Sequence, residues 1–250
     1  MLNLSIILPA YNEAELIGQS LVKLNDYLKK EMPDSIIEVI VVINSPASDG
    51  TLGVAQKSAK KLKLNKNHKF IIHDAKKRLG KGGAVKLGMQ MAKGEYKLFM
   101  DTDLAIPLKY VKQGIHKIIN QRTDVVIATR SLSSTSRSTI RLIMSSISSF
   151  AVRILILPGF KDTQCGFKLF TDQAADLVFS KLTSSSWSFD MEALLIARQN
   201  GLNIIQMPIE GVDEPKENGL AGDTAWIVAT QELKELLRFF INRLKGKYKR

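Results

Sequence analysis

The sequence has a single cysteine and three histidines, and this scarcity excludes several kinds of site. With Cys165 alone no intramolecular disulfide can form, which favours a reducing compartment. The histidines, His68, His73 and His116, do not have the spacing of zinc ligands. Cys165 could be a nucleophile, but no histidine lies near it in the sequence. A small buried cysteine is the commoner role for such a residue.

Long hydrophobic runs are also missing. A transmembrane helix needs about 20 consecutive apolar residues, and the nearest candidate, residues 142–157, contains Arg153 and four serines. Charged and polar residues follow the first predicted strand directly, so we expect no secretory signal. Any attachment to a membrane is therefore expected to be peripheral or through a partner.

Acidic residues are scarce relative to basic ones. The chain has 24 Asp and Glu against 36 Lys and Arg, which gives a net charge of +12. Such an excess favours anionic partners, namely nucleotides, phospholipid head groups or nucleic acid, although it also suits an inert solvated surface. Aromatic residues make up 7% of the chain and are not interleaved with the basic runs, so no nucleic-acid partner is expected.

Short apolar runs alternate with helical patterns through residue 130. This alternation predicts buried parallel strands joined by helices. The expected strands are residues 4–9, 36–43, 70–74, 96–100 and 124–129. The predicted fold class is therefore α/β, with a mostly parallel sheet covered by helices on both faces. No linker divides residues 1–210, which we expect to form one domain.

After residue 130 the pattern changes. Residues 131–139 suggest a loop and residues 140–157 an unusually apolar helix, followed by strands near 166–171 and 202–209 with helices between them. Residues 211–250 are expected to form a loop and a C-terminal amphipathic helix with a basic tail. Its apolar stripe comprises Leu233, Leu236, Leu237, Phe240, Ile241 and Leu244. Both apolar helices could either pack in the core or lie on an anionic membrane surface.

Two carboxylates, Asp101 and Asp103, directly follow the predicted strand at residues 96–100. They are one residue apart at the carboxyl end of a strand, where open α/β sheets place their ligand crevices. Such a pair favours a hard divalent cation, and Mg²⁺ takes one or two carboxylates together with substrate phosphates. The alternative is that both acids cap the next helix, because this spacing alone is a weak signal.

Residues 80–83 form a glycine-rich helix start with Arg78 and Lys81 nearby. It lacks the ending of an ATP-binding P-loop, so the remaining alternatives are an anion-binding helix start and a plain tight turn. Further along, Arg130 and Arg141 are suited to phosphate binding or to a solvated surface. Asp190 and Glu192 lie near a predicted helix start, where helix capping is the simpler role.

Five segments in order resemble the glycosyltransferases of family 2. The segments are residues 7–13, 80–84, 101–105, 162–168 and 187–190, and they extend from about residue 5 to residue 210. The last two resemble the branch that includes the dolichyl-phosphate β-glucosyltransferases, the dolichol-phosphate mannose synthases and other polyprenyl-phosphate glycosyltransferases. Any one segment is weak, whereas five at natural spacing are specific.

The resemblance implies a GT-A fold, with a nucleotide-sugar half at residues 1–130 and an acceptor half at residues 131–210. It implies Mg²⁺ or Mn²⁺ as cofactor and inverting transfer of a hexosyl group, glucose or mannose. The donor would be UDP-glucose or GDP-mannose, and the acceptor a polyprenyl phosphate at a membrane surface. The expected location is the cytoplasm, peripheral on the cytosolic face of a membrane.

The resemblance also implies roles for individual residues. The metal would bind Asp101 and Asp103, and Asp103 and Asp190 would be catalytic. Arg130 and Arg141 would clamp the acceptor phosphate. The residues expected around the nucleotide sugar are Pro9, Tyr11, Glu13, Asn44, Lys81, Asp101 and Asp103.

One segment departs from the family pattern. The family usually has Asp-Asp-Gly-Ser after the second strand, where an aspartate contacts the base, and residues 44–47 here are Asn-Ser-Pro-Ala. Asn44 can still hydrogen-bond a base edge as donor and acceptor. The change leaves open the identity of the donor and a non-catalytic homologue that binds nucleotides or a membrane surface. A separate alternative is a transferase with a glycan, protein or glycolipid acceptor.

Overall fold

The computed structural model describes residues 2–130, 157–210 and 234–249. The predicted loop at 131–139, nearly all of the predicted helix at 140–157, Arg141 and Leu233 lie outside the described residues, as do residues 211–233. Within the described part, no helix combines the length and the apolar character needed to cross a bilayer.

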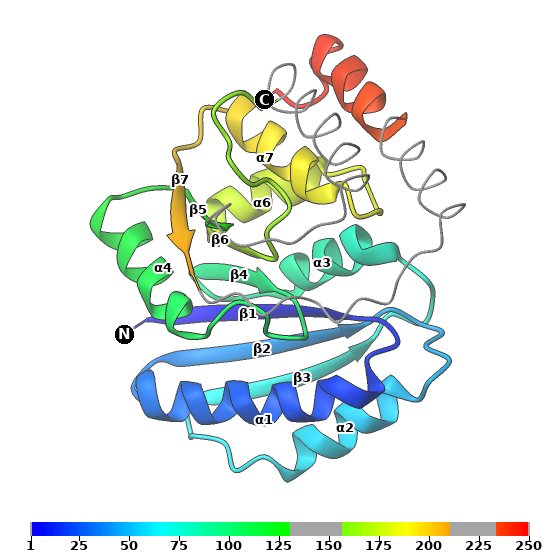
Figure 1. The fold of residues 1–250 in the computed structure, drawn as a ribbon, viewed down its shortest axis with the longest axis vertical. Coiled ribbons are helices and arrows are strands. Elements are labelled where there is room, and N and C mark those ends of the chain that lie inside the picture. Colours follow the sequence, from blue (N-terminus) through cyan, green and yellow to red (C-terminus); the bar gives the residue numbers. More distant parts are fainter. Residues whose placement is uncertain (1, 131–156, 211–233, 250) are drawn as a thin grey trace.

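Seven strands form one mixed sheet (Figure 1), as the alternating pattern predicted. They are β1 (Asn3–Ala10), β2 (Ile36–Ile43), β3 (His68–Asp74), β4 (Tyr96–Met100), β5 (Val125–Arg130), β6 (Phe167–Thr171) and β7 (Ile204–Ile209). Their spatial order is β3-β2-β1-β4-β6-β5-β7. Every pairing is parallel except those of β6, which runs antiparallel to both β4 and β5.

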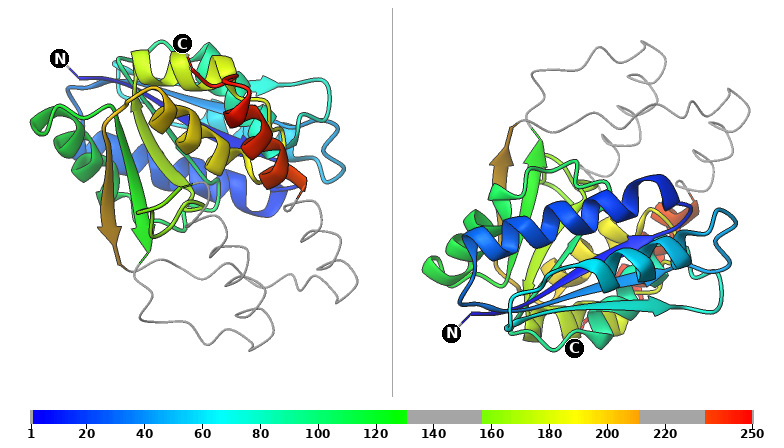
Figure 2. Two further views of the ribbon diagram at one scale, coloured as in Figure 1. Left: turned by 90° about the horizontal axis from the view of Figure 1, so that it is seen from above. Right: turned by 90° about the horizontal axis from the view of Figure 1, so that it is seen from below.

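Helices cover both faces of the sheet, as Figure 2 shows from two sides. One face carries α1 (Ala14–Glu31), α2 (Thr51–Lys61) and α4 (Lys109–Asn120); the other carries α3 (Gly80–Met91), α6 (Asp172–Lys181), α7 (Phe189–Gln199) and a helix at residues 234–244. Each strand contributes alternate side chains to the two cores, as the period of an extended chain requires. In β1, for example, Ile6 and Leu8 pack on the α1 side and Ile7 packs on the α3 side.

The strand directions bring distant loops together at one edge of the sheet. β1, β2, β3, β4 and β5 all end at this edge, because they are parallel to one another. β6 begins there, because it is antiparallel and Phe167 pairs with Met100, the last residue of β4. The loop before β6 therefore faces the loop after β4.

The C-terminal helix divides its apolar stripe between the core and the surface. Leu236 and Phe239 are buried, with exposed fractions of 6% and 0%. Leu237, Phe240, Ile241 and Leu244 are exposed. The sequence-based stripe was therefore wrong in one respect: it omitted Phe239, the residue that anchors the helix.

The segment after this helix folds back onto the domain. Tyr248 is 1% exposed. Its carbonyl oxygen accepts a hydrogen bond from Asn200 Nδ2 at 2.6 Å, and the Lys249 carbonyl accepts one from Lys181 Nζ at 2.8 Å. The predicted basic tail is thus docked by a buried tyrosine that the charge pattern did not suggest.

Candidate active site

Asp101 follows the last residue of β4 and lies against the loop before β6. Its backbone N–H donates to the Gly166 carbonyl at 3.3 Å, and its carboxylate lies 2.6 Å from Lys81 Nζ. A Cβ atom at Gly166 would overlap the Asp101 carboxylate. Glycine at position 166 therefore leaves the space that this carboxylate occupies.

Asp103 is the more solvent-accessible of the two acids. Its Oδ1 accepts a hydrogen bond from the Ala105 N–H at 3.0 Å, and its side chain still reaches solvent. Partial burial, and then the charge of Asp101, raise the pKa of Asp103 above its ordinary value. Burial and the charges of Asp103 and Asp101 likewise raise the pKa of Glu13. Three acids thus share a region of negative potential that favours a cation.

A small pocket of about 80 Å³ opens beside these acids. Its lining includes Asp101, Asp103, Arg130, Gln164 and Cys165. A larger hollow of about 450 Å³ lies between α1 and α4, and none of the predicted site residues lines it. The small pocket is therefore the better candidate, because it is the one that gathers the predicted residues.

Lys81 connects this pocket to the glycine-rich start of α3. Burial acts to lower the pKa of Lys81, but the charges of Asp101, Asp190 and Asp103 together raise it, so the ammonium is held charged. Its Nζ also lies 4.6 Å from the centroid of the Trp187 ring. Trp187 is 70% exposed, which is unusual for a large aromatic residue.

The glycines beside Lys81 are explained by close packing. A Cβ at Gly80 or Gly82 would overlap the Ser185 or Ser184 backbone, and the Gly82 N–H donates to the Ser185 carbonyl at 3.1 Å. The Leu79 N–H donates to Asn44 Oδ1 at 2.5 Å. Two N–H groups at this helix start are thus already used, so contact with an anion falls mainly to the Lys81 side chain.

The loops after β1 and β2 carry three of the residues predicted around the nucleotide sugar, which are Tyr11, Glu13 and Asn44. The Arg78 guanidinium stacks 4.9 Å from the centroid of the Tyr11 ring. The Glu13 N–H donates to Thr51 Oγ1 at 2.9 Å, which ties the two loops together. Pro9 is partly buried in β1. Asn44 is 5% exposed and its Oδ1 is engaged by Leu79, so its contact with a base stays a prediction.

Arg130, at the end of β5, is held by Asp162. Arg130 Nε lies 2.7 Å from Asp162 Oδ2, and Nη2 lies 3.1 Å from Oδ1, which is the two-pronged geometry that suits arginine. Hydrogen bonds and charge from Asp162 raise the pKa of Arg130. The predicted partner Arg141 is outside the described residues. Sequence reasoning did not pair Asp162 with Arg130, because 32 residues separate them.

Asp190 is held in a buried ion pair with Lys168. It is 3% exposed, and its Oδ1 accepts a hydrogen bond from Lys168 Nζ at 2.6 Å. Burial raises its pKa, and the charges of Lys168 and Lys81 oppose that shift. Lys168 was missed in the sequence, although a lysine inside the apolar strand β6 is the signal of a buried counter-charge.

Cys165 and Glu192 have structural surroundings. Cys165 is 2% exposed, and burial raises the pKa of its thiol to about 12, which keeps it protonated and unreactive. The Glu192 carboxylate is fully buried and accepts hydrogen bonds from Thr183 and Ser184. These surroundings favour the structural alternative for Cys165, and they give Glu192 a structural role in holding the loop at 183–184 in place of the expected helix capping.

Comparison with known proteins assigns the family. The family model described as "Glycosyl transferase family 2" matches residues 5–179. The dolichyl-phosphate beta-glucosyltransferase of Dictyostelium discoideum is 33% identical over 218 residues, covering 82% of this chain and 65% of the relative. The human dolichyl-phosphate beta-glucosyltransferase is 31% identical over 258 residues, covering 98% of this chain and 77% of the relative. The chain thus spans 65% of the Dictyostelium relative's length.

The fold matches solved structures as well. Glucosyl-3-phosphoglycerate synthase from Mycobacterium tuberculosis, in complex with Mn²⁺, UDP-glucose and phosphoglyceric acid, superposes with a TM-score of 0.67 at 16% identity. The match covers 96% of this chain and 80% of that one. This likeness confirms the predicted GT-A fold. With the matched residues reaching from β1 to α6, the chain belongs to glycosyl transferase family 2.

Proposed function

We propose that this chain transfers a glucosyl group from UDP-glucose to a dolichyl or other polyprenyl phosphate. The observation that carries the proposal is the cluster of Asp101, Asp103 and Lys81 at the end of β4, in a chain of family 2. The names of the relatives support a lipid-phosphate acceptor, and they favour UDP-glucose over GDP-mannose as donor.

The residues around Asp103 fit a divalent metal, which would be Mg²⁺ or Mn²⁺. Within the described residues no group of three acids, histidines or cysteines could enclose such an ion. Two carboxylates are nevertheless what Mg²⁺ uses when substrate phosphates complete its coordination. Asp103 would be the main ligand, because Lys81 already neutralises Asp101. When bound, the ion would stabilise the charge of the departing diphosphate.

Lys81 and Arg130 have the charges that the reaction needs. The acceptor phosphate is already ionised near neutral pH, so the main tasks are to neutralise the leaving diphosphate and to align two anions. The Lys81 ammonium would contact the diphosphate from the start of α3. Arg130 lines the same pocket and would contact the acceptor phosphate there, with its orientation restricted by the pairing with Asp162. Attack from the opposite side of the sugar carbon would invert its configuration.

Asp190 was expected to be catalytic, and its buried position favours an indirect role. It is buried against Lys168, and its charge helps to raise the pKa of Lys81. We therefore propose that Asp190 acts by supporting the charge of Lys81.

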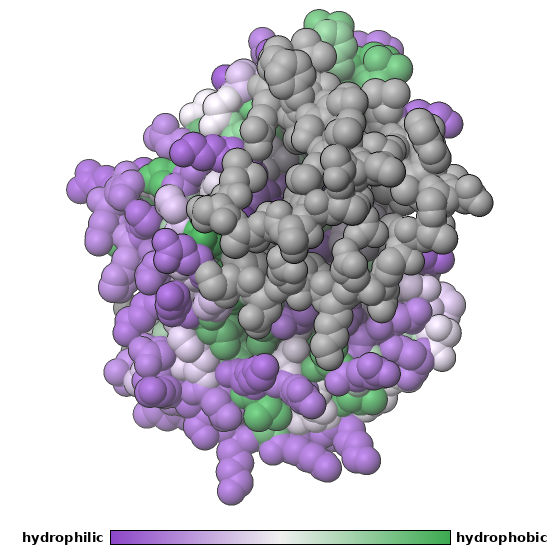
Figure 3. All heavy atoms as spheres, viewed as in Figure 1, coloured by the Kyte–Doolittle hydropathy of each residue, from purple (hydrophilic) through white to green (hydrophobic). Residues whose placement is uncertain are grey.

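The C-terminal helix supplies a surface for the lipid. Leu237, Phe240, Ile241 and Leu244 form an exposed apolar face, and hydrophobic atoms gather over this helix at the top of Figure 3. Lys234, Lys245 and Lys247 are exposed on the same segment. An apolar face with lysines around it suits an anionic membrane surface, which we propose to be on the cytosolic side.

A donor panel tests the proposal. Purified protein is incubated with UDP-glucose, GDP-mannose or other nucleotide sugars, with Mn²⁺ or Mg²⁺ and a polyprenyl phosphate, and nucleotide release is measured. We expect UDP release that requires both metal and lipid. If UDP is released only when a glycan or glycolipid is added, that compound replaces the polyprenyl phosphate as the proposed acceptor. Nucleotide binding without any turnover would favour the non-catalytic alternative, which the Asn44 position suggests.

A further inference from the structure

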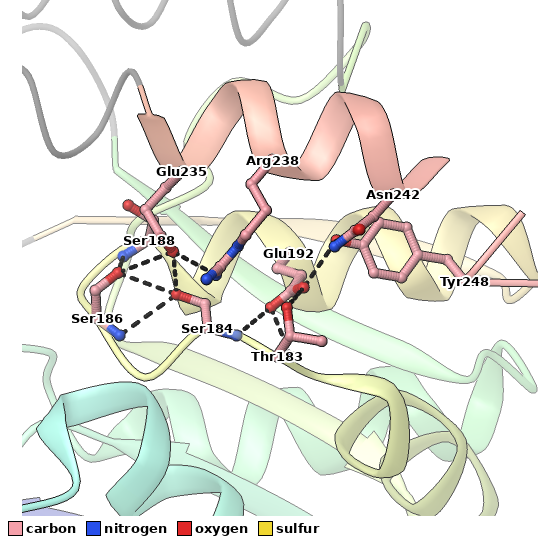
Figure 4. A network of polar contacts seen from close by, with 9 residues as sticks. All are labelled: Thr183, Ser184, Ser186, Ser188, Glu192, Glu235, Arg238, Asn242 and Tyr248. Carbon is pink, nitrogen blue, oxygen red and sulfur yellow. Dashed lines mark hydrogen bonds and ion pairs between the residues drawn. The ribbon is translucent and has the colours of Figure 1, made fainter. Parts of the chain in front are cut away.

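A polar cluster joins the C-terminal segment (residues 234–249) to the loop at residues 183–188. Figure 4 shows the side chains of this cluster, which come from the helix at residues 234–244, from the chain after it, from α7 and from the loop. None of its members was among the predicted site residues.

Glu192, in the first turn of α7, is the buried centre of the cluster. Its carboxylate accepts hydrogen bonds from the Thr183 N–H at 2.9 Å, the Thr183 hydroxyl at 2.6 Å and the Ser184 N–H at 2.6 Å. A fourth comes from the Tyr248 hydroxyl at 2.8 Å. Asn242 Nδ2 donates to the same hydroxyl at 3.2 Å. The C-terminal segment therefore completes the hydrogen bonding of a carboxylate that holds the loop.

Glu235 makes a second connection between the same two segments. Its Oε2 accepts hydrogen bonds from Ser184 Oγ at 2.6 Å, from Ser186 Oγ at 3.3 Å and from Arg238 Nη2 at 2.7 Å. Ser184 thus contacts two acids, Glu192 through its backbone and Glu235 through its side chain. The loop is fixed at both its backbone and its hydroxyl groups.

The other side of the loop contacts the candidate active site. The Ser185 carbonyl accepts the Gly82 N–H, and no space for a Cβ exists at Gly80 or Gly82. Trp187 lies over Lys81, whose ammonium pairs with Asp101. A shift of the loop would therefore move the start of α3 and change the surroundings of Lys81.

The anchoring of the C-terminal segment does not require this polar cluster. Leu236, Phe239 and the Tyr248 ring already pack into the hydrophobic core on the α7 side. Burial of such side chains supplies most of the stabilisation in a docked helix. Yet Glu192 on α7 and Glu235 on the C-terminal helix both bind the loop at 183–188. Docking of the C-terminal segment alone does not require both contacts.

We propose that the C-terminal segment positions the loop at 183–188, and through it Lys81 and Trp187, for binding the nucleotide sugar. Tyr248 and Glu235 are positioning residues, because they act through the loop. Trp187 offers an exposed indole beside the ammonium that would meet the diphosphate, and so completes the donor side of the pocket. The proposal rests on the proposed function only for the identity of the ligand.

Two conservative variants test the proposal. Tyr248→Phe removes the hydroxyl and keeps the ring, and Ser184→Ala removes the hydrogen bond to Glu235 and leaves its pair with Arg238. Each should raise the KM for UDP-glucose about three- to tenfold, the effect of one hydrogen bond. The KM for the lipid phosphate should stay unchanged. Lys181→Met is the matched control, because it frees the Lys249 carbonyl without touching the loop, and it should leave both KM values unchanged.

Hydrogen exchange provides a readout that is independent of turnover. In both variants the backbone amides of residues 78–84 should exchange faster, because Gly82 donates to the loop, whereas the control should match the parent protein. If the parent protein turns over no donor, the proposed function fails and this measurement still decides the positioning role. Unchanged exchange at 78–84 overturns the proposal. A lower kcat with both KM values unchanged also overturns it, because it reports only lost folded protein.

Discussion

At the scale of single residues, the candidate site is a balance of charges. Asp101, Asp103 and Glu13 concentrate negative charge, and Lys81 meets it at 2.6 Å from Asp101. Since the ammonium stays charged, it can exchange one anionic partner for another when a diphosphate arrives. The carboxylates are then free to hold a cation. Under the proposed function, the leaving group would lie between Lys81 and Asp103.

Replacement of Lys81 tests this balance. Lys81→Met should raise the Kd for UDP about tenfold, because one charge-assisted contact to the diphosphate is lost. Isothermal titration calorimetry in the presence of Mn²⁺ measures the change. Lys93→Met, which removes an exposed lysine near the end of α3, is the control and should bind UDP like the parent protein. Equal affinities for the Lys81 variant and the parent would refute the assigned role.

The pair of Arg130 and Asp162 makes a prediction about pH. Burial acts to raise the pKa of Asp162, but hydrogen bonds and charge from Arg130 lower it overall. A carboxyl whose pKa is lowered on folding contributes stability above its unfolded pKa of about 3.9, and loses that contribution as pH falls through the folded value. The melting temperature should therefore decrease below about pH 4 less steeply in Asp162→Asn than in the parent protein.

The control for this pH dependence is Asp26→Asn, which changes an exposed acid on α1. Its melting temperature should follow the parent curve at every pH. Parallel curves for Asp162→Asn and the parent would contradict the proposed contribution of the ion pair.

At the scale of helices and strands, the sheet order brings the site together. β6 runs antiparallel between β4 and β5, so its first residues meet the end of β4. Asp101 and Gly166 touch for this reason, and Lys168 on β6 reaches Asp190 on α7. Strand and helix positions up to residue 130 followed from the apolar periodicity. The direction of β6 did not, because a short apolar strand carries no signal of which neighbour it will pair with.

The buried pair of Lys168 and Asp190 links β6 to α7. Lys168→Met leaves the Asp190 carboxylate buried without its partner, and should lower the free energy of unfolding by about 3–5 kcal/mol. Urea unfolding monitored by circular dichroism measures this loss. Adding Asp190→Asn to Lys168→Met should restore part of it, since the unpaired charge is then removed. No recovery in the double variant would show that the pair is not the source of the loss.

The exposed face of the C-terminal helix makes a separate prediction. Leu237→Gln with Phe240→Gln should weaken binding to anionic phospholipid vesicles about tenfold or more, because two apolar side chains no longer enter the lipid. Vesicle co-sedimentation measures the binding. Leu64→Gln, which alters an exposed leucine elsewhere, should bind like the parent. Unchanged binding of the double variant would remove this helix from the proposed membrane surface.

At the scale of the whole molecule, the sequence motifs predicted which candidate site residues lie together better than they predicted the contacts between distant elements. Asp101, Asp103 and Lys81 were predicted together and lie together, because each follows a strand or begins a helix at the same edge. Asn44, Arg130 and Asp190 instead have protein partners that are distant in sequence, which are Leu79, Asp162 and Lys168. Such pairings depend on packing between elements, and no local pattern records them.

The C-terminal segment is a second case in which the sequence predicted an element but not its contacts with distant residues. Its helical periodicity was visible in the sequence, whereas the burial of Tyr248 and its bond to Glu192 were not. A tyrosine among four basic residues suggests a solvated tail. The Tyr248 ring is buried because it packs against elements that are distant in sequence, namely α7 and the loop at 183–188. Residues from the far end of the chain therefore complete the packing around α7 and the loop at 183–188.

In the proposed function, Asp103 supports transfer of glucose from UDP-glucose to a lipid phosphate. The most direct measurement follows radiolabelled glucose from UDP-glucose into dolichyl phosphate, with Mn²⁺ or with a chelator, for the parent protein and for Asp103→Asn. We expect a lipid-linked, acid-labile glucosyl phosphate with inverted configuration, which the chelator abolishes and Asp103→Asn reduces about 100-fold or more. Equal product formation by Asp103→Asn, or no labelled lipid from the folded parent protein, would contradict this proposal.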